Sequence, residues 1–262
     1  MKDSTCIGIF DSGLGGISVM RELIPPLPNQ DMIYYADSGN CPYGDKGSEW
    51  IIARSLELSE FLISCGANMI VVACNTATTA AIEALRSTFS IPFVGIEPAI
   101  KPAVALTRSR KIGVLATRGA LSSEFYEKTR ARFASDVEVI SVAGSGLAEL
   151  VDEGKIDEPS TETLLRGYIE PMMNAGVDTL VLGCTHYPFL ERVIAKIAPG
   201  MQVINPAPAV ARQAIRVLTQ GKLQCDSAGR RIFYTSGNAA QLQSFLDQLH
   251  IGYSSIEYKK VP

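Results

Sequence analysis

Short apolar runs, each followed by a turn rich in Gly, Ser, Thr or Asn and then by a helical pattern, recur along this 262-residue chain. Strands that are apolar on both faces and separated by helices predict parallel sheets with helices on both sides. The predicted strands are residues 6–10, 32–36, 69–73, 111–116, 137–142, 179–183 and 201–205. Residues 49–64 form an amphipathic pattern that predicts one of the intervening helices. The fold class is therefore expected to be α/β with mainly parallel sheets.

The second half of this pattern resembles the first. The matching pairs are IGIFDSG with IGVLATR, VVACNTA with VLGCTHY, and IPFVGIEPAI with MQVINPAPAV. Three matches in the same order predict two similar lobes, related by a pseudo-twofold axis, with the active site in the cleft between them. The stretches EPA and NPAPA mark where the chain crosses over. We expect one lobe at 1–97 plus 207–262 and the other at 98–206.

Composition limits the partners and the compartment. The formal net charge is −3 and no Lys/Arg run occurs, which argues against nucleic acid or an anionic membrane surface as a partner. MKDSTCIGIF enters a predicted strand at once and no apolar run is long enough for a membrane span, so we expect a cytoplasmic protein. The six cysteines are scattered without a C-x-x-C pair, so free thiols are expected. Cys6, Cys65 and Cys225 are interpreted as packing or incidental surface residues.

Cys74 and Cys184 occupy equivalent places, each at the end of a predicted strand and before a predicted helix. In parallel α/β sheets, ligands bind beyond the carboxyl ends of the strands. A helix N-terminus favours an anion and lowers the pKa of a thiol there. If the lobes face each other, the two thiols reach one small molecule from opposite sides. The hydrogen-bonding side chains that follow the thiols, able to hold a carboxylate, are Asn75, Thr76, Thr185 and His186.

Matched thiols suit the inversion of a carbon centre, which requires removing a proton from one face and returning one to the other. A free thiol has a pKa near ~8.5, so its surroundings must help to ionise it. His186 stands two residues from Cys184 and is placed to give that help or to protonate the product. A single cysteine at a strand end is more often a small packing residue. Two such junctions at equivalent places favour the catalytic interpretation.

Two turns are further candidates for the cleft. DSGLGGIS lacks the last Gly of G-x-G-x-x-G and the P-loop Lys, so a nucleotide is not expected. A Gly-rich turn with exposed N–H groups, which aims Asp11 and Ser12 at the ammonium group of a ligand, fits better. CPYG places Tyr43 and Gly44 near the cleft, whereas Cys41 has no match in the other lobe.

No metal or cofactor is expected. Cys184 and His186 are too close in sequence to bind one ion easily from regular backbone. No further Cys/His cluster completes a zinc site. No lysine for pyridoxal phosphate can be recognised by sequence.

Five motifs together resemble the signature set of the glutamate racemase family, in order and spacing over nearly the whole chain. They are GIFDSGLGG, ADSGNCPYG, VACNTAT, GIEPA and LGCTHYP. The resemblance implies a cofactor-independent enzyme that interconverts L- and D-glutamate and supplies D-glutamate for peptidoglycan. It also implies a homodimer.

The resemblance assigns roles to residues. Cys74 would act on D-glutamate with help from Asp11, and Cys184 would act on L-glutamate with help from His186. The implied substrate contacts are Asp11 and Ser12 at the amino end, Asn75, Thr76, Thr185 and His186 around the α-carboxylate, and Tyr43 and Gly44 at the side-chain carboxylate. Further candidates are Asp37, Thr117 and Asp152, the last standing where the family often has Glu.

Two alternatives stay open. A related racemase acting on aspartate or a hydantoin would keep both thiols, and one methylene of substrate length is worth little discrimination. A non-catalytic protein that binds an acidic metabolite would need the carboxylate-holding groups but would have no use for matched thiols.

Overall fold

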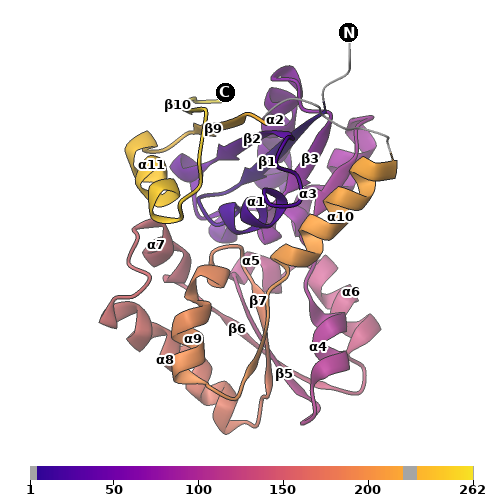
Figure 1. Ribbon diagram of the computed structural model, residues 1–262. Helices are drawn as coiled ribbons and strands as arrows, with labels where there is room; N and C mark the ends of the chain where they lie inside the picture. Colours follow the sequence, from indigo (N-terminus) through magenta and orange to yellow (C-terminus); the bar gives the residue numbers. More distant parts are fainter. Residues whose placement is uncertain (1–4, 221–228, 262) are drawn as a thin grey trace.

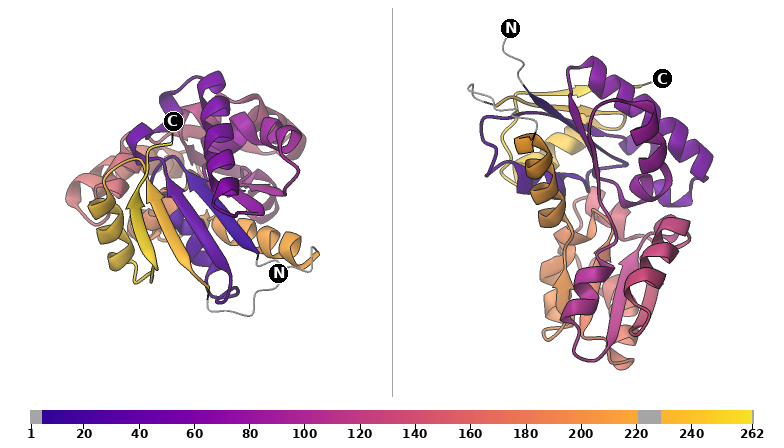
Figure 2. Two further views of the ribbon diagram at one scale, coloured as in Figure 1. Left: turned by 90° about the horizontal axis from the view of Figure 1, so that it is seen from above. Right: turned by 90° about the vertical axis from the view of Figure 1, so that its right-hand side faces the viewer.

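The computed structural model describes residues 5–220 and 229–261, so the prediction for Cys225 lies outside the described residues. Two lobes are stacked on each other, each built around a parallel sheet with helices on both faces (Figure 1). The side view in Figure 2 shows the two lobes one above the other along the long direction of the molecule. The predicted α/β class is confirmed.

The first sheet has six parallel strands in the order β10-β9-β2-β1-β3-β4. Its strands are β1 (Cys6–Asp11), β2 (Asp31–Ala36), β3 (Met69–Val72), β4 (Phe93–Gly95), β9 (Arg231–Thr235) and β10 (Ser255–Tyr258). The side chains of Ile7 and Ile9 belong to one hydrophobic cluster, and Phe10 belongs to another on the opposite face. The strands are therefore covered on both faces, as their continuous apolar runs predict.

The second sheet has four parallel strands in the order β6-β5-β7-β8. Its strands are β5 (Lys111–Ala116), β6 (Glu138–Ala143), β7 (Thr179–Gly183) and β8 (Gln202–Ile204). Four consecutive strands of the first sheet, β2-β1-β3-β4, have the same order when β2 is matched with β6 and β1 with β5. This equivalence agrees with the sequence repeat, in which β1 matches β5 and β3 matches β7.

Helices connect the strands and cover the sheets (Figure 1). The α-helices are α1 (Ile17–Leu23), α2 (Ser48–Ser64), α3 (Asn75–Thr88), α4 (Ile100–Leu106), α5 (Arg118–Leu121), α6 (Glu124–Phe133), α7 (Leu147–Asp152), α8 (Pro159–Asn174), α9 (Glu191–Ile197), α10 (Ala207–Gln220) and α11 (Ala239–Gln248). The 3₁₀ helices are η1 (Ser38–Asn40), η2 (Tyr43–Asp45) and η3 (Tyr187–Leu190). Within the described ranges, none of the helices has the length and apolar character that a membrane crossing needs.

The chain passes between the lobes twice. After β4 it enters α4, which contacts β7 of the second lobe, and after β8 it enters α10, which contacts α1 of the first lobe. These are the contacts that a division into 1–97 plus 207–262 and 98–206 requires, although the boundaries themselves stay a prediction.

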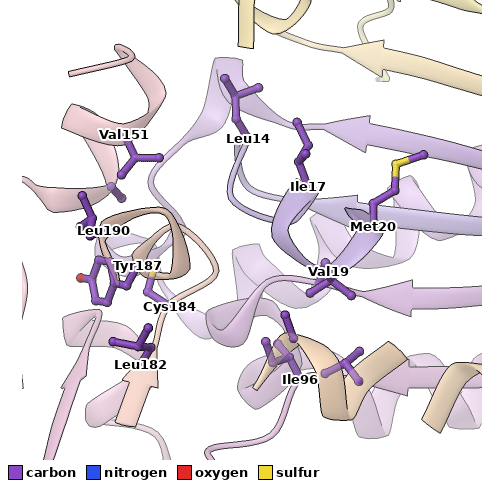
Figure 3. Packing of buried hydrophobic residues seen from close by; sticks show 14 of the residues in the cluster. Leu14, Ile17, Val19, Met20, Ile96, Val151, Leu182, Cys184, Tyr187 and Leu190 are labelled. Carbon is purple, nitrogen blue, oxygen red and sulfur yellow. The ribbon is translucent and has the colours of Figure 1, made fainter. Parts of the chain in front are cut away.

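One hydrophobic cluster joins the lobes beside the cleft. It includes Leu14 and Ile17 from the first lobe and Val151, Cys184 and Leu190 from the second. Figure 3 shows the side chains of Val151 and Leu190 on one side of this interface and those of Leu14 and Ile17 on the other. Because buried apolar contact holds this part of the interface, it positions the carboxyl ends of β1 and β7 against each other.

Candidate active site

Cys74 lies where β3 ends and α3 begins. It is the N-cap residue of α3, and its Sγ accepts a hydrogen bond from the N–H of Ala77 at 3.4 Å. The Cys74 side chain also lies 3.7 Å from the hydroxyl of Ser12, which follows β1. The thiol is only 4% exposed. The prediction of a thiol at a helix N-terminus is confirmed for this residue.

Cys184 follows β7 directly and is 5% exposed. The chain after it does not enter an α-helix at once, because η3 comes first and α9 begins only at Glu191. A helical segment therefore follows Cys184 as predicted, but Thr185 and His186 separate it from the sulfur and its first turn is a 3₁₀ helix. The Cys184 sulfur lies instead beside an imidazole, with 3.6 Å between Cys184 Sγ and His186 Nδ1.

Both thiols line one pocket between the lobes. The lining residues are Ser12, Cys41, Pro42, Tyr43, Gly44, Cys74, Asn75, Thr76, Thr117, Ala148, Cys184, Thr185 and His186. The enclosed space is about 20 Å³, close to what a single water molecule needs. Across the pocket, the hydroxyls of Thr76 and Thr117 lie 2.9 Å apart and form a hydrogen bond from lobe to lobe. The cleft is thus closed around the two sulfurs.

The carboxylate of Asp152, from the second lobe, contacts the imidazole of His186, which in turn lies beside the Cys184 sulfur. His186 Nε2 lies 2.9 Å from Asp152 Oδ1, and His186 is 2% exposed. Burial alone would lower the pKa of His186, but the Asp152 carboxylate, together with Cys184, raises that pKa well above its ordinary value. The His186 cation therefore lies directly beside the Cys184 sulfur.

The Gly-rich turn after β1 connects the contacts of Asp152 and His186 to the first lobe. The nitrogen of Gly15 lies 3.2 Å from His186 Nε2, and the N–H of Leu14 donates to Asp152 Oδ1 at 3.2 Å. The N–H groups of Gly13 and Gly16 donate to Asp11 Oδ2 at 3.2 and 3.0 Å. The turn therefore orients site side chains, and the expectation that these N–H groups face a ligand is wrong.

Asp11 is fully buried behind the pocket wall. Its Oδ1 accepts a hydrogen bond from the hydroxyl of Thr185 at 3.2 Å. Burial raises the pKa of the Asp11 carboxyl, and the neighbouring His186 offsets part of that rise. Asp11 is not among the lining residues, so its contact with an amino group stays a prediction.

The surroundings of Cys74 do not lower its pKa. Burial, with the negative charge of Asp11 beside it, raises the pKa of Cys74 to about 12, and the Ala77 N–H and the Ser12 hydroxyl offset only part of this. The prediction that the helix N-terminus lowers the pKa of this thiol is therefore wrong, because desolvation outweighs one N–H contact. In this structure Cys74 is a thiol, ready to donate a proton.

A buried ion pair supports the Tyr43 side of the pocket. Asp37 is fully buried and accepts hydrogen bonds from Arg54 Nε and Nη2, both at 2.9 Å. The Tyr43 hydroxyl donates to Asp37 Oδ2 at 2.6 Å, and the Ser236 hydroxyl donates to Oδ1 at 2.6 Å. Burial would raise the pKa of Asp37, but these donors, Arg54 first, hold it below its ordinary value. Asp37 thus fixes Tyr43 and contributes nothing to the pocket wall itself.

The structure brings most of the predicted residues together. Those that line the pocket are Ser12, Tyr43, Gly44, Cys74, Asn75, Thr76, Thr117, Cys184, Thr185 and His186. Those that stand behind it, in contact with lining residues, are Asp11, Asp37 and Asp152. The five cysteines within the described residues are free thiols, as predicted.

Sequence reasoning missed several members of the site. Cys41 lines the pocket, with its Sγ 3.6 Å from Asp152 Oδ2, although it has no counterpart in the other lobe. Pro42 and Ala148 also line it. Arg54 lies within an amphipathic helix, where nothing in the local pattern distinguishes it from a solvated arginine. Only the position of Cys41 in a turn after a strand could have indicated it.

Known proteins with the same sequence pattern and fold are racemases. The family model described as Asp/Glu/Hydantoin racemase matches residues 12–214. The chain is 45% identical to the glutamate racemase of Herpetosiphon aurantiacus over 96% of this chain and 100% of that protein. It is 48% identical to the glutamate racemase of Methylococcus capsulatus over 89% of this chain and 87% of that protein.

Solved structures agree. The glutamate racemase isoform RacE1 of Bacillus anthracis superposes with a TM-score of 0.89 at 32% identity, covering 100% of this chain and 99% of that one. Escherichia coli glutamate racemase, in complex with L-glutamate and the activator UDP-MurNAc-ala, superposes with a TM-score of 0.88 at 31% identity and 99% coverage of both chains. With two lobes of this fold, a pair of thiols in one cleft and these similarities, the chain belongs to the Asp/Glu/hydantoin racemase family.

Proposed function

We propose that this protein is a cofactor-independent glutamate racemase that moves protons with two thiols, Cys74 and Cys184. The observation that carries the proposal is the placement of both sulfurs, buried and contributed by equivalent strands of the two sheets, on the wall of one small pocket. A protein that only binds an acidic metabolite has no need of this pair. The high identity to glutamate racemases favours glutamate over aspartate or a hydantoin as the substrate.

The proposed step balances protons between the two sulfurs. In the direction from L- to D-glutamate, a thiolate on Cys184 removes the Cα proton and the Cys74 thiol gives its proton to the opposite face. Cys184 ends as a thiol and Cys74 as a thiolate, which is the state required for the reverse direction. Exchange of protons with solvent resets the pair.

The groups behind each sulfur fit this division of work. His186, held as a cation by Asp152, stabilises the thiolate on Cys184. Cys74, whose pKa is raised to about 12 by burial, is protonated and able to donate. Asp11, buried close to Cys74, is placed to receive or return its proton through a ligand's amino group.

The remaining polar groups match the ends of an amino acid. The Oδ1 atom of Asn75 is buried and has no hydrogen-bond partner within the part of the chain that the structure describes, so a ligand's ammonium group would satisfy it. The hydroxyls of Thr76 and Thr185 are donors for the α-carboxylate. The Tyr43 hydroxyl is committed to Asp37, so the backbone N–H groups at Tyr43 and Gly44 are the donors we propose for the side-chain carboxylate.

Glutamate is far larger than the enclosed space of about 20 Å³. Binding therefore requires the lobes to separate and the hydrogen bond between Thr76 and Thr117 to break. A net hydrogen bond of this kind contributes only about 0.5–1.5 kcal/mol, so substrate contacts can replace it.

The wider setting is also a proposal. A product of D-glutamate fits a role in supplying peptidoglycan synthesis in the cytoplasm, and we propose a homodimer. Light scattering of the eluted protein tests the assembly, since a dimer has twice the 28.2 kDa mass of the chain.

The experiment compares turnover of L-glutamate and L-aspartate by the purified chain without added cofactor, with the enantiomers separated by chiral chromatography. Each of Cys74→Ala and Cys184→Ala should lower kcat for glutamate by at least about 100-fold, the lower range for a lost acid/base group. Cys65→Ala, which removes a half-buried thiol outside the pocket, is the matched control and should keep full activity. Equal turnover of aspartate, or an active Cys74→Ala or Cys184→Ala variant, contradicts the proposal.

A further inference from the structure

Three side chains with metal-binding atoms converge beside the Gly-rich turn. Cys41 Sγ lies 3.6 Å from Asp152 Oδ2, and Asp152 Oδ1 lies 2.9 Å from His186 Nε2. One ligand atom from each residue lies within 4.8 Å of the other two. The residues come from η1–η2, α7 and the segment after β7, so their proximity exists only in the fold.

All three atoms lie close against Gly13. A Cβ atom at this position would lie 2.6 Å from Asp152 Oδ2, 3.1 Å from Cys41 Sγ and 3.2 Å from His186 Nε2. The three side chains can therefore converge here only because residue 13 is glycine, and a cation among them requires the side chains to move apart.

The separation of the Cys41 and Asp152 ligand atoms matches a tetrahedral ion of the size of Zn²⁺. Bonds of about 2.0–2.3 Å to N, O and S ligands place neighbouring ligand atoms about 3.3–3.8 Å apart in a tetrahedron. The 3.6 Å between Cys41 Sγ and Asp152 Oδ2 falls in this range. The 2.9 Å between Asp152 Oδ1 and His186 Nε2 is shorter, as expected for a hydrogen bond that a cation would replace.

The donor set selects the class of metal. One thiolate, one imidazole and one carboxylate favour Zn²⁺ or Co²⁺ over Mg²⁺ or Ca²⁺, which take oxygen ligands. Three protein ligands leave a fourth position for water. Cys41 is partly buried and the Asp152 side chain is 14% exposed, so the cluster borders solvent on this side.

We propose that Cys41, Asp152 and His186 form a binding site for Zn²⁺ or a similar divalent cation, and that an ion bound there inhibits the enzyme. A cation on His186 Nε2 and Asp152 breaks the ion pair between them. This pair lies on the far side of the imidazole from the Cys184 sulfur, which is 3.6 Å from His186 Nδ1. The metal site is independent of the proposed racemase activity, whereas its inhibitory effect rests on that activity.

Binding must release protons. Cys41 loses its thiol proton to solvent when the sulfur binds the ion, and a cationic His186 loses its Nε2 proton. Because ligand protons are released to solvent, binding becomes easier as the pH rises. The affinity for Zn²⁺ should therefore increase with pH between 6 and 8, without any change in oxidation state.

The first test uses Co²⁺ as a spectroscopic probe. The reduced, chelator-treated full chain is titrated with Co²⁺ under argon, and the sulfur-to-cobalt charge-transfer band in the near ultraviolet is followed. We expect a band that saturates at one equivalent and disappears on addition of Zn²⁺. Cys41→Ser should lose the band, whereas Cys65→Ser should keep it. An unchanged band in Cys41→Ser, or none in the wild type, overturns the site.

The second test separates the site from its effect. Asp152→Asn keeps the Cys41 thiol and the shape of the side chain, so its Co²⁺ band should remain while binding weakens by at least about tenfold. This variant decides the question if Cys41→Ser fails to fold. In the wild type, Zn²⁺ should inhibit turnover, and EDTA should restore it. The Zn²⁺ concentration that gives half-maximal inhibition should rise at least about tenfold in Cys41→Ser. Metal binding without inhibition overturns the inhibitory part alone.

Discussion

Replacement of Asp37 by alanine should destabilise the protein far more than its distance from the two thiols suggests. Asp37 accepts hydrogen bonds from Arg54, Tyr43 and Ser236. The side chains of Asp37 and Arg54 are 0% and 7% exposed. Removing the carboxylate leaves the Arg54 guanidinium buried without its bidentate partner, and Tyr43 and Ser236 without an acceptor.

The magnitude follows from these contacts. Removing one partner of a buried ion pair costs about 3–5 kcal/mol. Glu57 remains 2.9 Å from Arg54 Nη1, but its side chain is 47% exposed. Solvent therefore weakens the attraction of Glu57 for Arg54, which replaces only a small part of the lost ion pair. We therefore expect Asp37→Ala to lower the free energy of unfolding by about 3 kcal/mol at pH 7. The exposed pair of Asp136 and Arg110, with side chains 64% and 62% exposed, is the matched control, and Asp136→Ala should destabilise the protein far less than Asp37→Ala.

Urea unfolding followed by circular dichroism measures both variants. The pKa of Asp37 is lower in the folded state than its ordinary value, so its stabilising effect is present above about pH 4 and is lost as the pH falls through the folded-state pKa. Tyr43 loses its anchor in Asp37→Ala, and a hydrogen bond of about 1 kcal/mol corresponds to roughly a fivefold rise in KM for glutamate. If Asp37→Ala lowers the free energy of unfolding no more than Asp136→Ala does, the buried pair of Asp37 and Arg54 does not stabilise the fold.

Two other predictions test the surroundings of Cys184. Because Asp152 raises the pKa of His186, their pairing stabilises the fold fully below about pH 6.5 and this is lost as the pH rises through the folded-state pKa. The excess unfolding free energy of the wild type over Asp152→Asn should thus shrink with rising pH in urea titrations, and a constant difference would contradict the pairing. Gly15→Ala would place a Cβ 2.6 Å from Thr185 Oγ1 and 2.7 Å from His186 Cε1. It should therefore lower the free energy of unfolding by about 1–3 kcal/mol and abolish most of the activity. Gly47→Ala, whose Cβ would meet nothing within 4 Å, should melt and turn over like the wild type.

Most of the sheet architecture is predictable from the sequence because its strands are buried on both faces. Continuous apolar runs such as KIGVLA and TLVLG coincide with β5 and β7 residue for residue. The short strand β4 was not predicted, and neither were β9 and β10. Strands β9 and β10 extend the sheet beyond β2, and β10 is an edge strand with two exposed residues, so neither carries a long apolar run.

The site was predictable where chemistry repeats and unpredictable where it depends on tertiary packing. The equivalence of Cys74 and Cys184 follows from the internal repeat, and both line the pocket. The contacts of Cys41 and Arg54 join segments far apart in sequence, which no local pattern encodes. The pKa of Cys74 was misjudged because a helix N-terminus is visible in sequence, whereas the desolvation that outweighs it is not.

In the proposed mechanism, two sulfurs serve opposite faces of one carbon. The direct measurement starts from L-glutamate with protium at Cα in D₂O, stops at low conversion, separates the enantiomers and determines their mass. Two thiols predict D-glutamate that carries deuterium at Cα in nearly every molecule, while the remaining L-glutamate keeps its protium. D-glutamate that retains the original protium would mean that one group carries the proton from face to face, and would contradict the account.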